Sequence, residues 1–529
     1  MDNSNVYLKQ NVLAEPLFNQ WYAWPGLIFP ATAAMYIANS HIKIMQSFVS
    51  APQIHAAALK NPKNHGGPYL NYDQSRVNEV KQLLDETVRN QEHMLRFAEA
   101  VKALDSLLSA EANGSSLEPL YKKVPDALRG YVELVYDLNN NPSIRFIEGL
   151  LYRSPYYNSA SQSELLSLVE KDDRSFIFST PLLKSDGHLQ LDIDFSDERL
   201  DALFAMQRSP QPYSRIKESL GVKDRDDELF SSFFTQDVPR GSDKFSGEGV
   251  RVRYMGHACL LIESKDVAIL TDPVISCGID NGVPRYSYND LPDRIDFVLI
   301  THAHQDHCML ETLLRLRHRI ESIIVPKNNP GTLTDPSLRL MLQNIGFENV
   351  TEIDEMEVIK ITGGRIIGLP FLGEHGDLNI RTKSAYYASL EGRSVILAAD
   401  SNNVEPVMYE HVHEITKDID VLFIGMECDG APLTWIYGPL LTKPVARKVD
   451  QSRRLNGSDF EKGMAMVERF KPKQVYVYAM GQEPWMTYVT SIQYTEESHP
   501  IIESNKLVEG CRERGIISER LFGRKEILC

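Results

Sequence analysis

The C-terminal half of the chain carries many short apolar runs separated by polar and turn-forming residues. Runs of β-branched and aliphatic residues of this length predict buried strands. They cover residues 250–255, 259–263, 267–271, 297–301, 322–325, 358–362, 366–371, 384–390, 394–398, 421–425 and 474–479. Apolar residues at helical spacing predict helices over 309–317, 338–345 and 460–470. This half is therefore expected to be rich in strands, with helices between them.

The N-terminal half shows a different pattern. Apolar residues recur at helical spacing through residues 75–112, which predicts one or two long helices, and 128–138 suggests another. Residues 175–179 resemble a strand, and 188–195 alternate between apolar and polar positions as a half-buried strand does. We therefore expect an α+β domain here.

Aromatic residues are concentrated in the first 45 residues. They include Phe18, Trp21, Tyr22, Trp24, Phe29 and Tyr36. Such a segment is typical either of an arm that packs on another domain or subunit, or of an ordinary core segment. The pattern does not decide between these two interpretations.

Length and composition indicate a two-domain protein. A chain of 529 residues is too long for one core, and the polar stretch 224–246 is a suitable linker, although Phe233 and Phe234 suggest that part of it packs down. We expect an N-terminal α+β domain over residues 1–240 and a catalytic domain over 241–529. The net charge of −16 argues against nucleic-acid binding.

Cysteine usage and hydropathy bear on the compartment. The six cysteines show no disulfide framework, which favours reduced thiols. We see no signal peptide and no apolar segment long enough to span a membrane. A cytoplasmic location without membrane attachment is the expectation.

The most informative stretch is residues 298–307, where a buried strand ends in His302, His304, Asp306 and His307. Residues two apart in an extended chain point to the same side, so the first two imidazoles can reach one metal ion. Asp306 and His307 follow in the turn and can reach a second ion. A His-rich surface turn is the alternative interpretation, but four potential ligands within six positions favour a metal site.

This stretch resembles the His-X-His-X-Asp-His signature of the metallo-β-lactamase superfamily. Residues 254–263 and 268–273 resemble the opening strands of the same fold, and the resemblance covers roughly residues 247–481. It implies an αββα sandwich of two sheets, preceded here by the α+β domain. It also implies that Asp272 orients the metal ligands from behind.

Later ligands in this superfamily come from loops after later strands. Asp400 ends an apolar strand and is the candidate bridging carboxylate, while Glu374 and His375 share the loop that usually provides a histidine. The late strand 474–480, which is usually followed by a last histidine, has none here. Glu483 and His499 lie beyond it; we interpret His499 as a surface residue, and whether either contacts metal remains open.

With these departures the chain resembles the family formed by the diiron β-hydroxylase of chloramphenicol biosynthesis and its relatives. The resemblance implies that His302, His304 and Glu374 hold one iron. It implies that Asp306 and His307 hold the other, with Asp400 bridging the two. A site with more carboxylates and fewer imidazoles favours iron over zinc.

The same resemblance implies an activity and partners. The enzyme would use two iron ions, O₂ and an external electron donor to hydroxylate the β-carbon of an amino acid. That amino acid would be held as a thioester on a nonribosomal-peptide carrier protein. An electron-transfer partner and a homodimer are also expected from the family.

Other residues are candidates for catalysis or docking. We expect Glu374, Asp400 and Glu427 to act in catalysis, with Trp435 and Tyr437 lining a substrate channel or simply packing in their loop. A basic run contains Lys443, Arg447, Lys448, Arg453 and Arg454. It could steer an acidic carrier protein or be a solvated helix face.

Three alternatives stay open from the sequence. A relative of the same family could take coenzyme A esters instead of carrier-bound substrates. A dinuclear zinc hydrolase of the same fold would use His375 rather than Glu374 as a ligand. A binding or scaffold protein with a vestigial site is disfavoured by the intact histidine signature.

Overall fold

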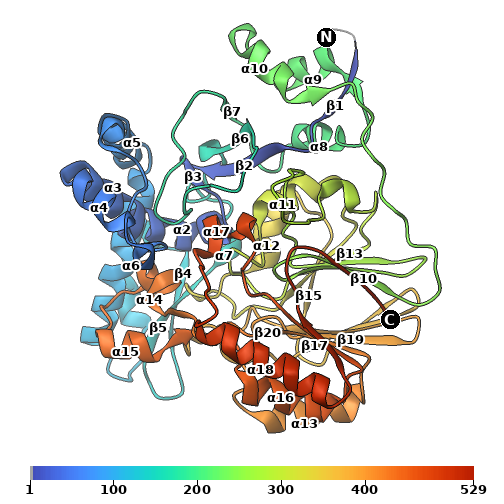
Figure 1. Cartoon of the computed structure of the whole chain (residues 1–529). Helices are drawn as coiled ribbons and strands as arrows, with labels where there is room; N and C mark the ends of the chain where they lie inside the picture. Colours follow the sequence, from blue (N-terminus) through green and yellow to red (C-terminus); the bar gives the residue numbers. More distant parts are fainter. Residues whose placement is uncertain (1–3) are drawn as a thin grey trace.

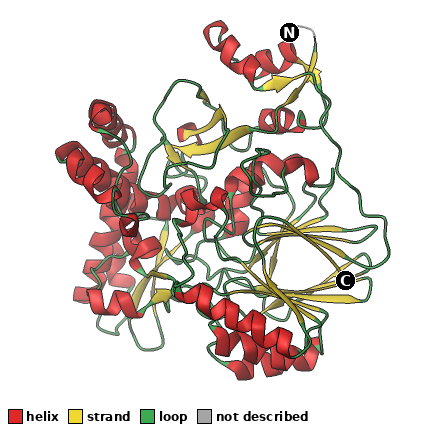
Figure 2. Cartoon of the chain, viewed as in Figure 1, coloured by secondary structure: helices red, strands yellow, loops and turns green. Residues whose placement is uncertain are grey.

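The computed structural model describes residues 4–529, and its centre is a pair of facing seven-stranded sheets with helices on their outer sides (Figures 1 and 2). The first sheet has the order β15-β14-β13-β12-β11-β10-β25. Its strands are β10 (Arg251–Gly256), β11 (Cys259–Glu263), β12 (Ala268–Thr271), β13 (Phe297–Leu299), β14 (Ile323–Pro326), β15 (Val350–Ile353) and β25 (Lys525–Leu528). Neighbours are antiparallel from β25 to β12 and parallel from β12 to β15.

The second sheet has the order β16-β17-β18-β19-β20-β23-β24. Its strands are β16 (Val358–Ile361), β17 (Gly364–Leu369), β18 (Ala385–Leu390), β19 (Arg393–Leu397), β20 (Val421–Gly425), β23 (Gln474–Tyr478) and β24 (Ile517–Arg520). Helices α13 (Pro406–Thr416), α16 (Phe460–Phe470) and α18 (His499–Glu513) cover its outer face (Figure 1). Helices α11 (Leu310–Leu316) and α12 (Leu338–Asn344) cover the first sheet. This is the αββα sandwich that the sequence predicted.

The N-terminal half is mixed helix and strand. Its helices are α1 (Pro25–Ile28), α2 (Pro30–Tyr36), η1 (Ile37–His41, a π-helical segment), α3 (Ile42–Ser50), α4 (Pro52–Leu59), α5 (Val77–Asn90), α6 (Glu92–Glu111), α7 (Glu148–Leu151), α8 (Glu198–Ala205), α9 (Tyr213–Ser219) and α10 (Asp227–Ser232). Its strands are β1 (Asn5–Leu8), β2 (Val12–Phe18), β3 (Trp21–Tyr22), β4 (Val132–Tyr136), β5 (Pro142–Phe146), β6 (Gln162–Leu168), β7 (Leu189–Leu191), β8 (Gln211–Pro212) and β9 (Phe234–Thr235). The long helices expected over 75–112 are α5 and α6.

Two local predictions were wrong. The segment 128–138 contains strand β4 and no α-helix, because Val132 and Leu134 are both buried at strand spacing and β4 pairs with β5. Residues 175–179 form no strand. Phe176 and Phe178 instead pack their rings against Trp435 of the catalytic half.

The expected linker is folded over its first part. Helix α10 and strand β9 lie within residues 224–246, and β9 pairs with β1 at the other end of the N-terminal half. Phe230, Phe233 and Phe234 are buried there. The polar composition predicted a connection, but these aromatic side chains fix the first part against the core. An extended stretch without helix or strand follows, from residue 236 to residue 250.

The aromatic residues of the first 45 positions are buried within this chain. Trp21 and Tyr22 are 1% and 2% exposed, and the segment shares one hydrophobic core with α11, α12 and the outer side of the first sheet. The segment therefore packs in a core and on the other half of the same chain, so the structure fits both the core interpretation and that of an arm packed on another domain. None of the described helices is long and apolar enough to cross a membrane.

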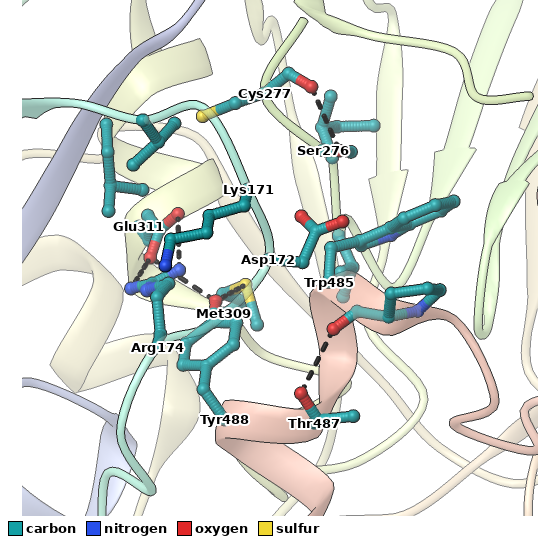
Figure 3. A pocket seen from close by; sticks show the side chains of 15 residues that line it. Lys171, Asp172, Arg174, Ser276, Cys277, Met309, Glu311, Trp485, Thr487 and Tyr488 are labelled. Carbon is teal, nitrogen blue, oxygen red and sulfur yellow. Dashed lines mark hydrogen bonds and ion pairs between the residues drawn. The ribbon is translucent and has the colours of Figure 1, made fainter. Parts of the chain in front are cut away.

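A buried ion cluster joins the two halves. Arg174 lies 2.6 Å from Glu15 of β2 and 2.8 Å from Glu311 of α11. Its guanidinium also lies over the ring of Tyr488, 3.5 Å from the centroid. Figure 3 shows Arg174, Glu311 and Tyr488 meeting from three separate segments. One cation thereby pairs with two buried carboxylates at the junction.

Replacing Arg174 with alanine is expected to lower the free energy of unfolding by about 3–5 kcal/mol, because Glu15 and Glu311 would stay buried without a cation. Urea unfolding followed by tryptophan fluorescence would measure the change. Arg96→Ala is the matched control, since Arg96 and Glu92 form an exposed ion pair worth at most about 1 kcal/mol. Equal losses in the two variants would contradict the assignment.

Candidate metal centre

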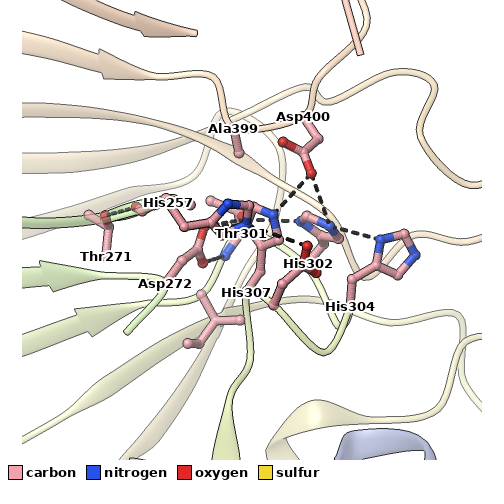
Figure 4. A network of polar contacts seen from close by, with 12 residues as sticks. His257, Thr271, Asp272, Thr301, His302, His304, His307, Ala399 and Asp400 are labelled. Atoms are coloured by element: carbon pink, nitrogen blue, oxygen red, sulfur yellow. Dashed lines mark hydrogen bonds and ion pairs between the residues drawn. The ribbon is translucent and has the colours of Figure 1, made fainter. Parts of the chain in front are cut away.

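The four signature residues lie just beyond the end of β13, at the edge where the two sheets meet. His302 and His307 are fully buried, His304 is 6% exposed, and the side chain of Asp306 is mostly buried. Figure 4 shows His302, His304 and His307 gathered below Asp400, which comes from the second sheet. The structure therefore brings together ligand types from both sheets, as expected for loops held by a rigid scaffold.

One group of ligand atoms comes from His302, His304 and Glu374. Nε2 of His302 and Nδ1 of His304 are 3.1 Å apart, and Oε1 of Glu374 is 3.2 Å from the same Nδ1. The three atoms all lie within 4.8 Å of one another. Atoms around one metal ion at bond lengths near 2.0–2.2 Å are spaced in this way.

Asp400 links this group to a second one. Its Oδ2 is 3.9 Å from Nε2 of His302 and 3.0 Å from Nε2 of His307. Asp306 and His307 belong to a further group of convergent atoms. A carboxylate placed between two imidazoles of different groups has the position that a bridging ligand requires.

Asp272 holds this arrangement from behind, as the sequence predicted. Oδ1 accepts the backbone N–H of Thr301 at 2.7 Å, and Oδ2 accepts the hydroxyl of Thr301 at 2.6 Å. Oδ2 also lies 2.8 Å from Nδ1 of His307. The carboxylate accepts the Nδ1 hydrogen of His307, so Nε2 of that ring faces Asp400.

Tyr437 fixes the ring of His304 in the same manner. Its hydroxyl lies 2.9 Å from Nε2 of His304. The other nitrogen, Nδ1, is left facing His302 and Glu374. A partner on the outer nitrogen sets which nitrogen is free to bind a metal ion. The sequence left open whether Tyr437 lines a channel or packs in its loop; the structure makes it the hydrogen-bond partner of a candidate ligand.

His257 is the residue at this site that the sequence reasoning missed. Its Nε2 lies 3.4 Å from Oδ2 of Asp306, and its ring contacts that of His307 edge-on. The backbone N–H of Gly481 donates to its Nδ1 at 3.1 Å. In the neutral ring Nε2 therefore carries the hydrogen and has no lone pair for a metal ion. The signal was present in the sequence, because His257 directly follows the first strand of the fold.

The remaining candidates belong to none of the convergent groups. His375 is buried beside the ring of His304, but its Nδ1 contacts the carbonyl of Gly373 at 3.4 Å. Glu483 is buried and accepts the hydroxyl of Tyr254. His499 is half-exposed, as expected for a surface residue.

The charges of the cluster fit bound cations. Burial lowers the pKa of His302 far below its usual value and that of His304 to about 4, so both rings are neutral with a lone pair for a metal ion. Burial, and then the charge of Asp400, raises the pKa of Glu374 well above its usual value. Buried carboxylates this close together require a cation or a proton. The residues therefore fit two metal ions held by imidazole nitrogen and carboxylate oxygen, a set that suits iron.

Backbone strain is concentrated in the loops of this site. His257, Asp272, Glu374, Ala399 and Ala479 all have positive φ, between 34° and 64°. Non-glycine residues adopt this region rarely and at a cost, and such residues cluster at functional sites. Here each residue lies where a strand or its following loop turns toward the metal ligands.

A cavity of about 500 Å³ lies over the ligands. His304, Asp306, Glu374, Asp400 and Glu427 line its inner end. The remaining wall includes N-terminal residues 65–67, residues 490–494 near the C-terminus, and Trp435 of the segment that follows β20. The candidate centre is therefore reached through a space that both halves of the chain enclose.

Glu427 is the other acidic residue of this cavity. It accepts the backbone N–H groups of Gly430 and Asp429 at 2.8 and 3.2 Å. Burial raises the pKa of its carboxyl group to about 7. It belongs to none of the convergent groups.

Comparison with known proteins identifies the family. Residues 7–238 match the N-terminal domain of the diiron non-heme β-hydroxylases, and residues 251–447 match the β-lactamase superfamily domain. A 3-hydroxylase of Streptomyces venezuelae that acts on 4-amino-L-phenylalanyl-[CmlP-peptidyl-carrier-protein] is 38% identical over 98% of this chain and 99% of its own length. A metal-dependent hydrolase of Methanopyrus kandleri is 28% identical over 29% of this chain and 62% of its own length.

The solved structures agree. The crystal structure of CmlA, a diiron β-hydroxylase from Streptomyces venezuelae, matches with a TM-score of 0.93 and 36% identity over the full length of both chains. Both the fold class and the family resemblance expected from the sequence are thereby confirmed. The chain belongs to the family of non-heme diiron β-hydroxylases.

Proposed function

We propose that this enzyme hydroxylates the β-carbon of an amino acid held as a thioester on a nonribosomal-peptide carrier protein. The observation that carries the proposal is the convergence of six proposed ligands, together with His257, beside a cavity. That set occurs in a chain similar over its whole length to a hydroxylase of a carrier-bound amino acid.

The ligands divide between two iron ions. His302, His304 and Glu374 would hold the first ion. His307 and Asp306 would hold the second, and Asp400 would lie between the two. Two iron ions held there supply the chemistry of reductive O₂ activation, with two electrons from an external donor. Overall, one C–H bond, O₂, two electrons and two protons yield one alcohol and one water.

The chain's own groups prepare the cavity for this chemistry. Asp272 and Tyr437 fix the rings of His307 and His304, so the ligand atoms are oriented before substrate arrives. Glu427 has a pKa near 7 in the same cavity. It can bind the substrate's ammonium group as an anion or transfer a proton, and we propose it as a catalytic residue with Glu374 and Asp400.

The positions of Glu374 and His375 also bear on the alternative of a zinc hydrolase. Zinc hydrolysis with His375 as ligand is disfavoured, because Glu374 rather than His375 points at His304. A coenzyme A ester remains the second candidate substrate of the family. An electron-transfer partner and a homodimer are part of the proposal, although the aromatic residues of the N-terminal segment are already buried within one chain.

Turnover with a loaded carrier protein under ¹⁸O₂ tests the reaction. Carriers bearing different amino acids would be supplied with a chemical or enzymatic reductant, and the product thioester would be analysed by mass spectrometry. One ¹⁸O atom at the β-carbon is expected. A hydroxylated product without the label would contradict the oxygenase assignment, and cleavage of the thioester without O₂ would favour a hydrolase.

Separate replacement of Glu374 and of His375 by alanine tests the ligand set. Glu374→Ala is expected to lower the bound iron from two ions toward one per chain, because it removes a ligand from the first group. His375→Ala should retain both ions, and it is the matched control for disturbance of the loop. Elemental analysis and the optical spectrum of the diiron centre measure the outcome. Iron loss in His375→Ala alone would reverse the assignment.

His257 is expected to position Asp306 through its Nε2 hydrogen. Loss of such a partner of a metal ligand typically weakens metal affinity by roughly 10–100-fold. His257→Asn, whose shorter side chain cannot reach Asp306, should show this weakening in competition titrations with a chelator. His257→Gln places an amide N–H near the position of Nε2 and should restore most of the affinity. Equal affinities in both variants would contradict the role.

A further inference from the structure

A second, larger cavity lies on the outer side of the first. It is a cleft of about 980 Å³ between the N-terminal helices and the segment 432–445 of the catalytic half. The N-terminal wall comes from α2, η1, α3 and α6, together with residues 66–69, Phe176 and Phe178. Asn39 donates a hydrogen bond to the carbonyl of Pro439 at 2.7 Å, and the hydroxyl of Tyr36 bonds the carbonyl of Ile436. The two walls are therefore joined directly, and the cleft is part of the folded structure.

The charge of this cleft is opposite to that of the whole chain. Lys43, Lys102 and Lys443 line it, and none of the described residues in its lining is acidic. The chain as a whole carries a net charge of −16. A concave surface lined by one sign of charge concentrates ligands of the other sign.

The ammonium groups of the cleft contact neutral oxygens. Lys443 donates to the hydroxyl of Ser109 at 2.9 Å, and Lys102 donates to the amide oxygen of Asn39. Burial, and then the nearby charge of Lys43, lowers the pKa of Lys102. Two neighbouring cations whose charges are not compensated in the lining of the cleft are suited to bind an anion such as a phosphate.

The cleft adjoins the metal cavity through a narrow boundary. Gly66, Gly67 and Trp435 line both spaces. The indole N–H of Trp435 donates to the carbonyl of Gly66 at 3.0 Å, so this pair forms the boundary. Gly66 has φ of +79°, and a Cβ there would lie 2.9 Å from Ser491. A side chain is thus excluded where the two spaces meet.

The two spaces differ in polarity. The inner one presents Asp306, Glu374, Asp400 and Glu427, and the outer one presents lysines. A molecule that carries an ammonium group at one end and a phosphate at the other would match both. An aminoacyl thioester on a phosphopantetheine arm has this distribution of charge.

We propose that the outer cleft binds the phosphopantetheine arm of the carrier protein. Its phosphate contacts Lys43, Lys102 and Lys443, and its thioester end passes Trp435 to the metal centre. This assignment rests on the proposed function, because it presumes a carrier-bound substrate. It also limits the docking role expected for the basic run. Arg453 and Arg454 donate to the backbone carbonyls of Gly376 and of Asp429 and Gly430, and within the described residues only Lys443 of that run lines the cleft.

Binding of two small probes to the full-length iron-loaded protein tests the proposal without turnover. The probes are 4′-phosphopantetheine and pantetheine, which differ by the phosphate alone, and isothermal titration calorimetry measures their affinities. Phosphopantetheine should bind roughly tenfold more tightly or better, because its phosphate can accept charge-assisted hydrogen bonds from the lysines and pantetheine has no such group. The double variant Lys43→Glu/Lys443→Glu should abolish this difference, since both side chains are exposed and reversal leaves the core intact.

Lys360→Glu is the matched control, because Lys360 is exposed on β16 and lines neither cavity. It should keep the preference for the phosphorylated probe. Equal affinities, undetectable binding of both probes, or an undiminished preference in the double variant would each overturn the proposal. Tenfold tighter binding of coenzyme A than of phosphopantetheine would also overturn it, in favour of a coenzyme A ester. Because no turnover is involved, these results are independent of whether ¹⁸O labelling supports hydroxylation.

Discussion

The metal centre depends on a buried carboxylate that accepts three hydrogen bonds. Asp272 receives the backbone and side chain of Thr301 and faces Nδ1 of His307, and it is fully buried. A buried carboxylate is costly unless its oxygens are satisfied. Here the hydrogen-bond donors are Thr301, which follows β13, and His307 of the ligand loop. The hydrogen bonds that stabilise the buried carboxylate of Asp272 therefore also set the direction of the ligands.

The accumulation of negative charge at the site explains why it needs cations. Carboxylates from both sheets converge on buried imidazoles. Electrostatic repulsion among them is strong at low dielectric, and two metal ions would relieve it. The backbone at His257, Glu374 and Ala399 has positive φ, which costs free energy. The free energy of metal binding would offset this cost.

The N-terminal half contributes to the active site as well as to stability. Its residues 65–67 form one wall of the metal cavity, and its helices form one side of the lysine-lined cleft. The buried cluster around Arg174 and the shared hydrophobic core hold this wall in place. A catalytic sandwich without the N-terminal half would lack the outer part of both spaces. This gives a physical reason for a long N-terminal region in front of a metallo-β-lactamase fold.

The sequence by itself determined most of the strands and the cluster His302, His304, Asp306 and His307, because buried strands show their period and these ligands keep short spacings along the chain. The sandwich and the roles of Asp272, Glu374 and Asp400 were implied by the resemblance of these motifs to a known family. Tertiary structure alone decided the role of His257, whose tautomer is set by Gly481, 224 residues away. It also decided that the segment 128–138 contains a strand, since pairing with β5 overrides its helical spacing. The cleft could not be read from the sequence, because Lys43, Lys102 and Lys443 meet only after the two halves pack, and contacts between distant segments leave no local pattern.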